Sequence, residues 1–276
     1  MATLIDWSAN EIEAAGESVP ESKTLEAFFQ SVTAARQSTL LLDFDGTLAP
    51  FRVDPSKVRP WAGVASLLDE IQQADRTRLA IITGRPAPDV ASQLALRNVP
   101  EIWGLHGAER LYPDGRVEQE ELVGDEQELL AAARFAVLEA RLGVRVEEKR
   151  NAVVVHWRGK PSHSIQTLRT HALKLLRPFA GSAAMNLLEF DGGLELRAGR
   201  HKGDAVRMIL AEIPDRVPVA YLGDDATDED AFSALAGRGL GVLVRREWRP
   251  GAATIWLRPP AQLREFLGMW LRATRG

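Results

Sequence analysis

LLLDFDGTLAP, at residues 40–50, joins a short apolar run to two carboxylates, a glycine and a hydroxyl residue. The run TLLLDF (39–44) predicts a buried strand. Side chains two residues apart on a strand project to the same side, so Asp43 and Asp45 can serve one site at its end. We interpret Asp43 as a nucleophile for a phosphoryl group, and Asp45 as the acid for the leaving alcohol and then the base for water. For this motif alone, an acidic turn that ends a strand is the alternative.

The flanking segments alternate between helix and strand patterns. In chain order, the predicted elements are a helix at 61–74, a strand at 78–83, a helix at 86–96, a strand at 101–106, a helix at 202–213, a strand at 217–223, a helix from Thr227, a strand at 239–244 and a helix from Pro260. Such alternation predicts a parallel, doubly wound α/β sheet with ligands beyond the carboxyl ends of its strands. DFDG (43–46), TGR (83–85) and HGAE (106–109) fall at predicted strand ends, so we expect them to share one site.

The middle of the chain departs from this alternation. The turn dipeptide Asp114-Gly115 is followed by a helix pattern at 129–140, strands at 144–149 and 151–158, a helix pattern at 165–179 and a hairpin at 185–197 that turns at 191–193. This order predicts a small α+β domain inserted into the sheet domain. The domains that we expect are a polar N-terminal extension outside the core at 1–36, a catalytic core at 37–114 and 196–276, and a cap domain at 115–195.

A second acidic motif, GDDATDEDAF (223–232), directly follows the apolar run 217–222. Asp224, Asp225 and Asp228 gather carboxylates at one strand end, where they repel one another unless a cation offsets their charge. Oxygen ligands suit a hard cation, and Mg²⁺ is the natural candidate. The alternative is a helix whose acidic first turn interacts with the helix dipole.

Two further polar residues stand where they can contact a phosphoryl group. Lys202, in RHKGDAV at the head of a predicted helix, can hold the nucleophilic carboxylate and the phosphoryl oxygens together by charge. Thr83 ends the second predicted strand and can donate to a phosphoryl oxygen. Each has an ordinary alternative, because lysines are usually solvated and Thr83 could instead cap the helix that begins near Pro86.

Composition narrows the partners and the chemistry. The 276 residues carry 34 Lys and Arg against 38 Asp and Glu, so no global positive charge indicates nucleic acid or an anionic membrane as a partner. No apolar stretch reaches about 18 residues and the first residues lack a signal-peptide pattern, so we expect a cytoplasmic protein. The absence of cysteine excludes disulfides and thiolate catalysis, so a metal must be held by oxygen or histidine. The chain also lacks a Walker A loop, an HExxH helix and a GxSxG elbow.

Four strings together, DFDGTL, TGR, the Lys202-Gly203 pair and GDDATDED, resemble in this order the motifs of the haloacid dehalogenase (HAD) superfamily of aspartate-nucleophile phosphotransferases. The resemblance implies a HAD-like, Rossmannoid parallel-sheet core, and the insertion resembles the α/β (C2-type) cap of members that hydrolyse sugar phosphates. The roles that it implies are Asp43 as nucleophile, Asp45 as acid and base, Thr83 and Lys202 on the phosphate, and Mg²⁺ held by Asp43, the backbone carbonyl of Asp45 and Asp224, with Asp228 in support.

Several strings narrow the resemblance further. GLHGAE (104–109), EEKRNAVVVHWR (147–158), LELR (194–197) and GDDATDEDAF are similar to those of the trehalose-6-phosphate phosphatases. This similarity implies hydrolysis of trehalose 6-phosphate to trehalose and inorganic phosphate, through an aspartyl phosphate, in trehalose biosynthesis. A disaccharide exposes many hydroxyls, which carboxylates and charged donors recognise well. The substrate-binding residues that we expect are Glu147, Lys149 and Glu195, with Gly84, Arg85, His106, His156 and Arg158.

Other interpretations stay open at this point. His156 and Arg158 could form a strand-end pair that is solvated or that pairs with the neighbouring strand. The substrate could be another sugar phosphate, of the sucrose, glucosylglycerol or mannosylglycerate type. A regulatory relative without turnover is the alternative from another class. It is disfavoured because Asp43, Asp45, Lys202 and Asp224 are all intact. As partners we expect a small-molecule sugar phosphate, no nucleic acid and no membrane, and a functional pairing with a trehalose-phosphate synthase.

Overall fold

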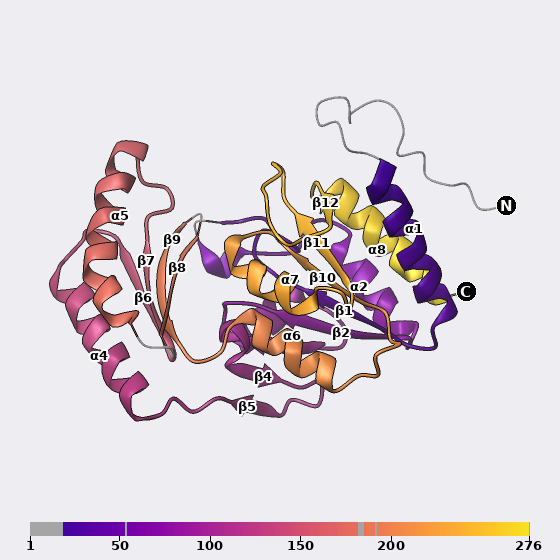
Figure 1. Cartoon of the computed structure of the whole chain (residues 1–276), viewed down its shortest axis with the longest axis horizontal. Helices are drawn as coiled ribbons and strands as arrows, with labels where there is room; N and C mark the ends of the chain where they lie inside the picture. Colours follow the sequence, from indigo (N-terminus) through magenta and orange to yellow (C-terminus); the bar gives the residue numbers. More distant parts are fainter. Residues whose placement is uncertain (1–18, 53, 182–184, 191, 276) are drawn as a thin grey trace.

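The computed structural model describes residues 19–52, 54–181, 185–190 and 192–275, which form two β-sheets with helices packed on them (Figure 1). Residues 1–18 of the predicted extension and Asp191 of the predicted hairpin turn lie outside the described residues. Within the described part of the chain, no helix combines the length and the apolar character that a membrane crossing needs.

The larger sheet follows the strand order β12-β11-β10-β1-β2-β3-β4-β5. Its strands are β1 (Ser38–Leu42), β2 (Thr77–Ile82), β3 (Glu101–Gly104), β4 (Glu109–Leu111), β5 (Val117–Gln119), β10 (Val219–Gly223), β11 (Leu240–Val244) and β12 (Ile255–Leu257). Pairing is parallel from β12 to β3, and β4 and β5 extend that edge in antiparallel pairs. The predicted parallel α/β sheet is confirmed.

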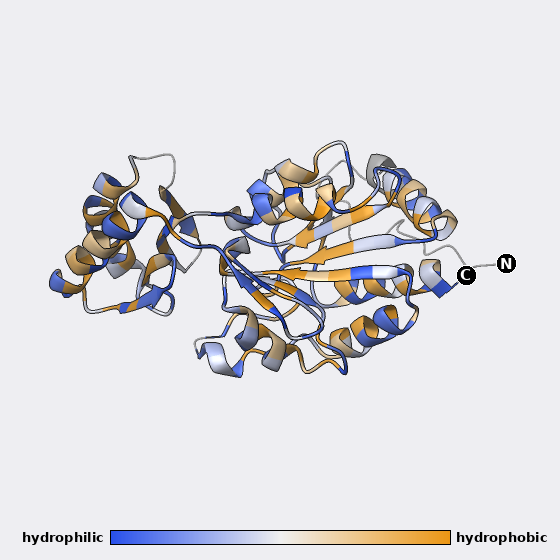
Figure 2. Ribbon diagram, turned by 90° about the horizontal axis from the view of Figure 1, so that it is seen from below, coloured by the Kyte–Doolittle hydropathy of each residue, from blue (hydrophilic) through white to orange (hydrophobic). Residues whose placement is uncertain are grey.

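The central strand β1 is buried on both faces, and its alternating side chains separate two helix layers. Leu40 and Leu42 belong to one apolar cluster and Leu41 to the other. The first cluster includes side chains of α1 (Val19–Ala34), α2 (Val64–Gln73), α3 (Ala87–Leu94) and α8 (Ala261–Arg275), and the second those of α6 (Lys202–Ala211) and α7 (Glu229–Leu235). Figure 2 shows the apolar strands between these polar-faced helices. Short 3-10 turns lie at Pro55–Lys57, Leu105–Gly107, Arg177–Phe179 and Ala226–Asp228.

Helix α1 corrects one expectation from the sequence. We expected residues 1–36 to lie outside the core, but Leu25, Phe29 and Val32 are buried in the same apolar cluster as β1. The ring of Phe29 packs against that of Phe266 in α8, with centroids 5.2 Å apart. A few large side chains suffice for this contact, so the helical pattern in the sequence was too weak to indicate burial.

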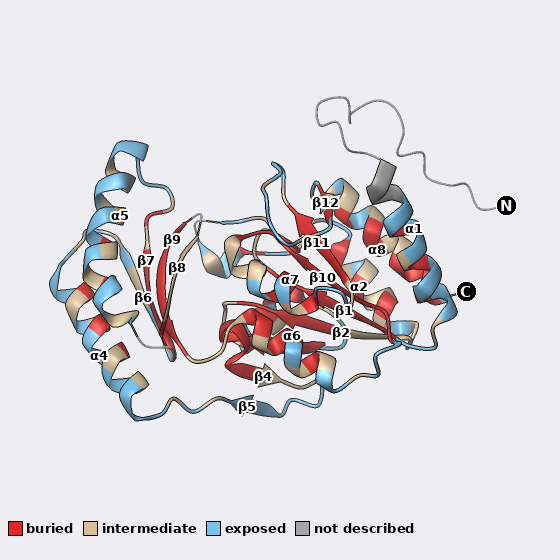
Figure 3. Ribbon diagram, in the orientation of Figure 1, coloured by how far each residue is buried: buried red, intermediate tan, exposed pale blue. Residues whose placement is uncertain are grey.

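The smaller sheet has the order β6-β7-β9-β8 and is antiparallel throughout. Its elements are α4 (Gly124–Glu139), β6 (Arg145–Lys149), β7 (Ala152–His156), α5 (Ser162–Leu176), β8 (Met185–Phe190) and β9 (Gly193–Ala198), in the predicted order of helix, hairpin, helix, hairpin. Val153, Val155, Leu194 and Leu196 form a cluster with α4 and α5 on one face of this sheet. Figure 3 shows that the two helices are buried in patches and otherwise exposed.

Two predicted boundaries of the insertion are wrong. The Asp114-Gly115 turn lies between β4 and β5, and both strands belong to the larger sheet, so the insertion begins after Gln119. At the other end, β9 continues to Ala198, past the predicted boundary at residue 195. Strands of three residues show too little alternation to be recognised in a sequence, so the turn dipeptide alone does not reveal that the larger sheet continues past it.

Candidate active site

A pocket of about 600 Å³ is lined by the larger sheet on one side and by the insertion on the other. Asp43 follows β1, Thr83 follows β2 and Asp224 follows β10, so the carboxyl ends of three neighbouring parallel strands meet there. Lys202 begins α6 and reaches the same point. The pocket therefore lies where a doubly wound sheet binds ligands, and its volume suits a small organic molecule.

Lys202 is the charge partner of Asp43. Its Nζ donates to Asp43 Oδ1 at 2.6 Å and to Asp228 Oδ1 at 2.7 Å, and all three residues are buried. Burial alone would lower the pKa of Lys202, but the two carboxylates outweigh it and raise this pKa above its ordinary value. The ammonium group is therefore charged, and it fixes a positive charge beside the predicted nucleophile.

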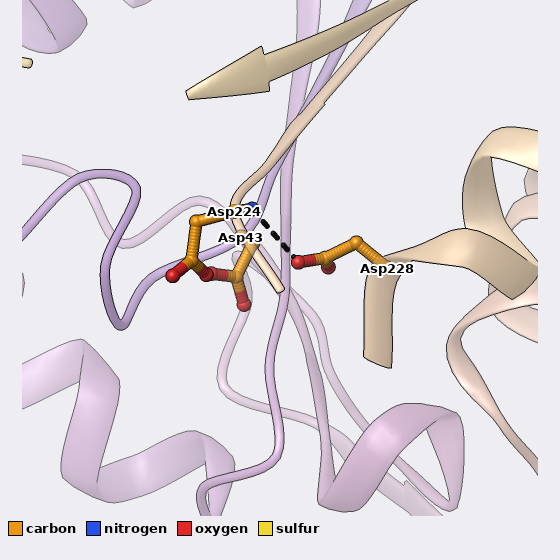
Figure 4. A group of neighbouring side chains, drawn as sticks. All are labelled: Asp43, Asp224 and Asp228. Carbon is orange, nitrogen blue, oxygen red and sulfur yellow. Dashed lines mark hydrogen bonds between the residues drawn. The ribbon is translucent and has the colours of Figure 1, made fainter. Parts of the chain in front are cut away.

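The carboxylates of Asp43, Asp224 and Asp228 gather at this point (Figure 4). One oxygen from each lies within 4.8 Å of the others. Burial raises the pKa of Asp43 to about 7 in spite of Lys202, and burial together with Asp43 raises the pKa of Asp224 well above its ordinary value. Burial would also raise the pKa of Asp228, but Lys202 and the Tyr221 hydroxyl, which both donate to it, hold this pKa below its ordinary value.

Asp228 is paired at both oxygens. Oδ1 accepts from Lys202 and Tyr221, and Oδ2 accepts from the backbone amides of Asp224 and Asp225 at 2.9 and 3.0 Å, the former drawn as the dashed line in Figure 4. Asp228 thus fixes the backbone of the loop that carries Asp224 and Asp225. Because both of its oxygens are already bonded, Asp228 is placed to position the other two carboxylates and not to bind a cation in their stead.

The cluster fits a hard cation. Asp43 Oδ2 is buried and finds no hydrogen-bond partner among the described residues. Buried carboxylates this close together are stable only when one is protonated or when a cation offsets their charge. Gly46, with a φ of +88°, brings the backbone so near that a Cβ there would lie 2.0 Å from Asp224 Oδ2. The residues present therefore suit a cation bound through oxygen.

Asp45 forms a two-pronged ion pair with Arg85. Arg85 Nε donates to Asp45 Oδ2 at 2.5 Å, and Nη2 donates to Oδ1 at 2.6 Å. Arg85 Nη1 donates to the carbonyl of Pro55 at 2.7 Å and to Gln93 Oε1 at 3.0 Å, which holds the guanidinium in place. Asp43 and Asp45 do line one pocket, but in this conformation Arg85 is bonded to Asp45.

On the insertion, two carboxylates are each held by a histidine and by a cation. Glu195 Oε2 lies 3.1 Å from His106 Nε2, and Glu195 Oε1 accepts from Lys149 Nζ at 3.2 Å. Glu147 Oε2 lies 2.8 Å from His156 Nε2 and also accepts from Arg145. The hydrogen bond from His156 lowers the pKa of Glu147. His156 therefore pairs with the neighbouring strand, as its structural alternative stated.

The register of the smaller sheet places these carboxylates in one row. Glu147 pairs with Val154, and Val154 pairs with Glu195, so the two carboxylates flank an apolar side chain on a shared face. All three line the pocket. Two carboxylates held in fixed positions on a sheet can accept hydrogen bonds from several hydroxyls.

The pocket brings together almost every residue predicted for the site. The predicted residues that line it are Asp43, Asp45, Thr83, Gly84, Arg85, His106, Glu147, Lys149, His156, Arg158, Glu195, Lys202 and Asp224. Asp228 is fully buried and is not among the lining residues.

Sequence reasoning missed several lining residues, among them Phe51, Arg52, Asp89 and Phe190. The guanidinium of Arg158 lies over the ring of Phe51, 3.9 Å from its centroid, and so joins the insertion to the core. An apolar residue just after DFDGTLAP was a signal that could have drawn attention to Phe51. No local pattern indicates its contact with a residue so distant in the sequence.

Comparisons with known proteins agree with this site. The family model of the trehalose-phosphatases matches residues 41–250. A trehalose-phosphate phosphatase of Mycobacterium ulcerans is 33% identical over 254 residues, which cover 83% of this chain and 60% of that protein. The chain thus spans about 60% of the length of this curated relative.

Solved structures show the same fold. The C-terminal domain of a trehalose-6-phosphate phosphatase from C. albicans matches with a TM-score of 0.77 at 22% identity, covering 90% of this chain and 96% of that one. A haloacid dehalogenase-like hydrolase from B. subtilis matches with a TM-score of 0.57 at 16% identity, covering 84% of this chain and 99% of that one. The predicted HAD-like fold, a parallel-sheet core with an inserted α+β domain, is confirmed. Since the family model covers most of its length, this chain belongs to the trehalose-phosphatase family.

Proposed function

We propose that this chain hydrolyses trehalose 6-phosphate to trehalose and inorganic phosphate. The observation that carries the proposal is one pocket in which a centre suited to phosphoryl transfer faces charged side chains suited to sugar hydroxyls. Glu147, Lys149 and Glu195 provide those charged groups. Lys149 and Glu195 bond to each other, and Glu147 is held by His156. The name of the M. ulcerans relative supports trehalose phosphate as the substrate.

Asp43 and Asp45 divide the chemistry. Asp43 attacks the phosphorus, so that an Oδ–P bond forms while the bond from phosphorus to the sugar O6 breaks, and Asp45 gives its proton to O6. Asp45 then takes a proton from water, whose oxygen attacks the phosphorus and releases Asp43 with inorganic phosphate. Lys202 stays beside Asp43 and balances its charge, and the buried Thr83 hydroxyl donates to a phosphoryl oxygen.

Arg85 links substrate binding to this proton transfer. In the free protein it occupies both oxygens of Asp45. A phosphate dianion competes for the same guanidinium, because Arg binds phosphate and carboxylate in the same two-pronged geometry. Transfer of Arg85 to the incoming phosphate frees Asp45 to take up a proton from water and to donate it to the sugar O6. Gly84, next to it in the loop, borders the same phosphoryl group.

We infer that the cation is Mg²⁺. Phosphatases of the HAD superfamily are generally metal-dependent, and the acidic cluster of this chain fits a hard cation. The side chains of Asp43 and Asp224 and the backbone carbonyl of Asp45 would hold it, with Asp228 orienting their loop. When bound, such a cation offsets the phosphoryl charge and keeps the nucleophilic carboxylate ionised.

The insertion, residues 120–198, is proposed as a cap that closes over the disaccharide and excludes bulk water. Its support is the pocket wall that it provides and the contact of Arg158 with Phe51 on the core. His106, His156 and Arg158 border the sugar in this proposal. The substrate is a glycosyl-transfer product that keeps its 6-phosphate, so we infer a functional pairing with a trehalose-phosphate synthase. A cytoplasmic location stays a prediction from the sequence, which shows no signal-peptide pattern and no long apolar stretch.

Phosphate release from trehalose 6-phosphate, with Mg²⁺ or with a chelator, tests the proposal. We expect turnover by the wild type with Mg²⁺ only, and a loss of about 1,000-fold or more in kcat for Asp43→Asn. Asp215→Asn makes the same chemical change at a fully exposed carboxylate and should match the wild type. Substantial turnover by Asp43→Asn would refute the nucleophile.

The same assay decides between the alternatives. Sucrose phosphate, glucosylglycerol phosphate and mannosyl phosphoglycerate are measured beside trehalose 6-phosphate. Equal rates on all four would contradict the trehalose assignment. No release from any of them with Mg²⁺ would instead favour a regulatory protein.

A further inference from the structure

His106 connects the two parts of the molecule. It lies in the turn after β3 of the core, and its Nε2 lies 3.1 Å from Oε2 of Glu195, which belongs to β9 of the insertion. Both residues are buried, at 4% and 3% exposed. Lys149, from the insertion itself, occupies the other oxygen of Glu195. One carboxylate is thus held from the core on one side and from the insertion on the other.

The turn that carries His106 has a strained backbone, which hydrogen bonds to a neighbouring loop hold in place. Leu105, His106 and Gly107 have successive φ values of +49°, +60° and +105°. This conformation is unfavourable for residues other than glycine and persists only where its surroundings impose it. The amides of His106 and Leu105 donate to the carbonyls of Thr83 and Arg85 at 2.8 and 2.9 Å. Two backbone hydrogen bonds therefore fix this turn to the TGR loop, residues 83–85.

The imidazole itself also contacts that loop. It lies so close to Gly84 that a Cβ there would be 2.5 Å from His106 Nε2. Gly84 follows Thr83, the residue proposed to donate to the phosphate. One imidazole thus touches the phosphate side of the pocket through Gly84 and its sugar side through Glu195.

The hydrogen bond to Glu195 defines the tautomer of His106. Burial lowers the pKa of His106 to about 3, in spite of Glu195, so the imidazole is neutral. Burial alone would raise the pKa of Glu195, but Lys149 and His106 hold it well below its ordinary value. An ionised carboxylate only accepts, so Nε2 must carry the proton. His106 Nδ1 is then a buried acceptor, with no partner in the part of the chain that the structure describes.

We propose that His106 is a positioning residue that acts through Glu195, fixing the separation between the sugar-binding carboxylate of the insertion and the phosphoryl site of the core. The proposal rests on the proposed function of the pocket as a sugar-phosphate site, and it sharpens the role of His106 from a substrate contact to a support for one. The consequence is selectivity among phosphate esters. The position that His106 gives to Glu195 speeds the reaction only of a substrate long enough to reach from Asp43 to Glu195.

Two substitutions separate this role from a purely structural one. The amide nitrogen of His106→Gln is as many bonds from Cβ as Nε2 is, so this variant keeps the donor, whereas the shorter His106→Asn does not reach Glu195. Asn tolerates a left-handed backbone better than Gln does. A positioning role thus predicts that the Gln variant is the more active, and a backbone role predicts the reverse. His163→Asn, on the exposed start of α5, is the matched control and should equal the wild type.

The readout is kcat/KM on trehalose 6-phosphate and on p-nitrophenyl phosphate, which has no sugar to reach Glu195. On the sugar phosphate we expect a loss of about 10- to 100-fold for His106→Asn, the cost of a hydrogen bond to a charged group, and about fivefold or less for His106→Gln. The loss of the Asn variant on p-nitrophenyl phosphate should be smaller by about tenfold. In a Glu195→Ala background, His106→Asn should add less than about threefold, because both changes remove one interaction. Equal losses for Asn and Gln, equal losses on both substrates, or full additivity would each overturn the proposal.

Imidazole ¹⁵N NMR spectra of protein labelled at histidine test the hydrogen bond between His106 and Glu195 without an activity measurement. The His106 signals, assigned by their loss in His106→Gln, should report a proton on Nε2 that persists from about pH 5 to 8, and they should shift in Glu195→Gln. A proton on Nδ1, or titration near the ordinary histidine pKa, would overturn the proposal. If the wild type hydrolysed no sugar phosphate, the proposed function would fail, while these spectra would still decide the His106–Glu195 link.

Discussion

Mg²⁺ affinity should rise with pH up to about 7, because the cation must displace a proton from Asp43. Burial raises the pKa of this carboxyl from 3.8 to about 7 in the metal-free protein. Between these two values the carboxyl is protonated in the folded chain and ionised in the unfolded chain. The pKa of Asp224 is also raised, and this group steepens the dependence in the same direction.

The size of the effect follows from the two pKa values of Asp43. A difference of about three pH units between folded and unfolded states corresponds to about 4 kcal/mol of stability. For an acid whose pKa is raised by folding, this stability is complete below the unfolded pKa and is lost as the pH rises to the folded one. The metal-free protein should therefore lose stability at this site between about pH 4 and 7. Over this range Asp43 alone raises the apparent Mg²⁺ affinity by up to about tenfold per pH unit, and Asp224 adds to that slope.

Thermal unfolding from about pH 5.5 to 8.5, in Mg²⁺ and in a chelator, measures both effects. The gap in Tm between the two conditions should widen as the pH rises. Calorimetry near pH 6, in two buffers of different ionisation enthalpy, should find about one proton or more released per Mg²⁺ bound. Asp43→Asn removes one of the two titrating groups and should make the dependence shallower. A gap that stays constant across this range in the wild type would refute the reasoning.

Three further outcomes test other parts of the structure. Phe29→Ala should lower the free energy of unfolding in urea by about 3 to 5 kcal/mol, because the ring is buried against α8. Phe135→Ala, at a position 69% exposed, should change this free energy by about 0.5 kcal/mol or less. Equal effects of the two substitutions would show that α1 does not pack on the core. Gly46→Ala should weaken Mg²⁺ binding by calorimetry about tenfold or more, since its Cβ would lie 2.0 Å from Asp224 Oδ2, and normal affinity would contradict the geometry. Arg85→Lys should lower kcat in phosphate-release assays by about tenfold, because an ammonium cannot make the two-pronged bond, and an unchanged kcat would rule out the transfer step.

The sequence was most informative where a pattern and its chemistry coincide. Apolar runs of five or six residues predict buried strands, and carboxylates that follow two of them mark the active edge of the sheet. Asp43 and Asp224 could be placed together in this way. The order of the motifs along the chain then indicated the superfamily, which also implied the cap.

Elements without a local pattern escaped prediction. β4 and β5 have three residues each, and α1 packs through a few large side chains, so neither shows a clear period. The side-chain hydrogen bonds could not be predicted either, because Arg85 and Asp45, like His106 and Glu195, lie far apart in the sequence. Such pairings follow from tertiary packing, which no short window of sequence contains.

Helices α1 and α8 pack side by side at the end of the larger sheet that is remote from the insertion (Figure 1). A solid support attached to an exposed side chain of either helix would therefore lie away from the mouth of the pocket. Attachment at either helix should leave the proposed closure of the insertion unhindered. Attachment to α4 or α5 would instead restrain the insertion itself.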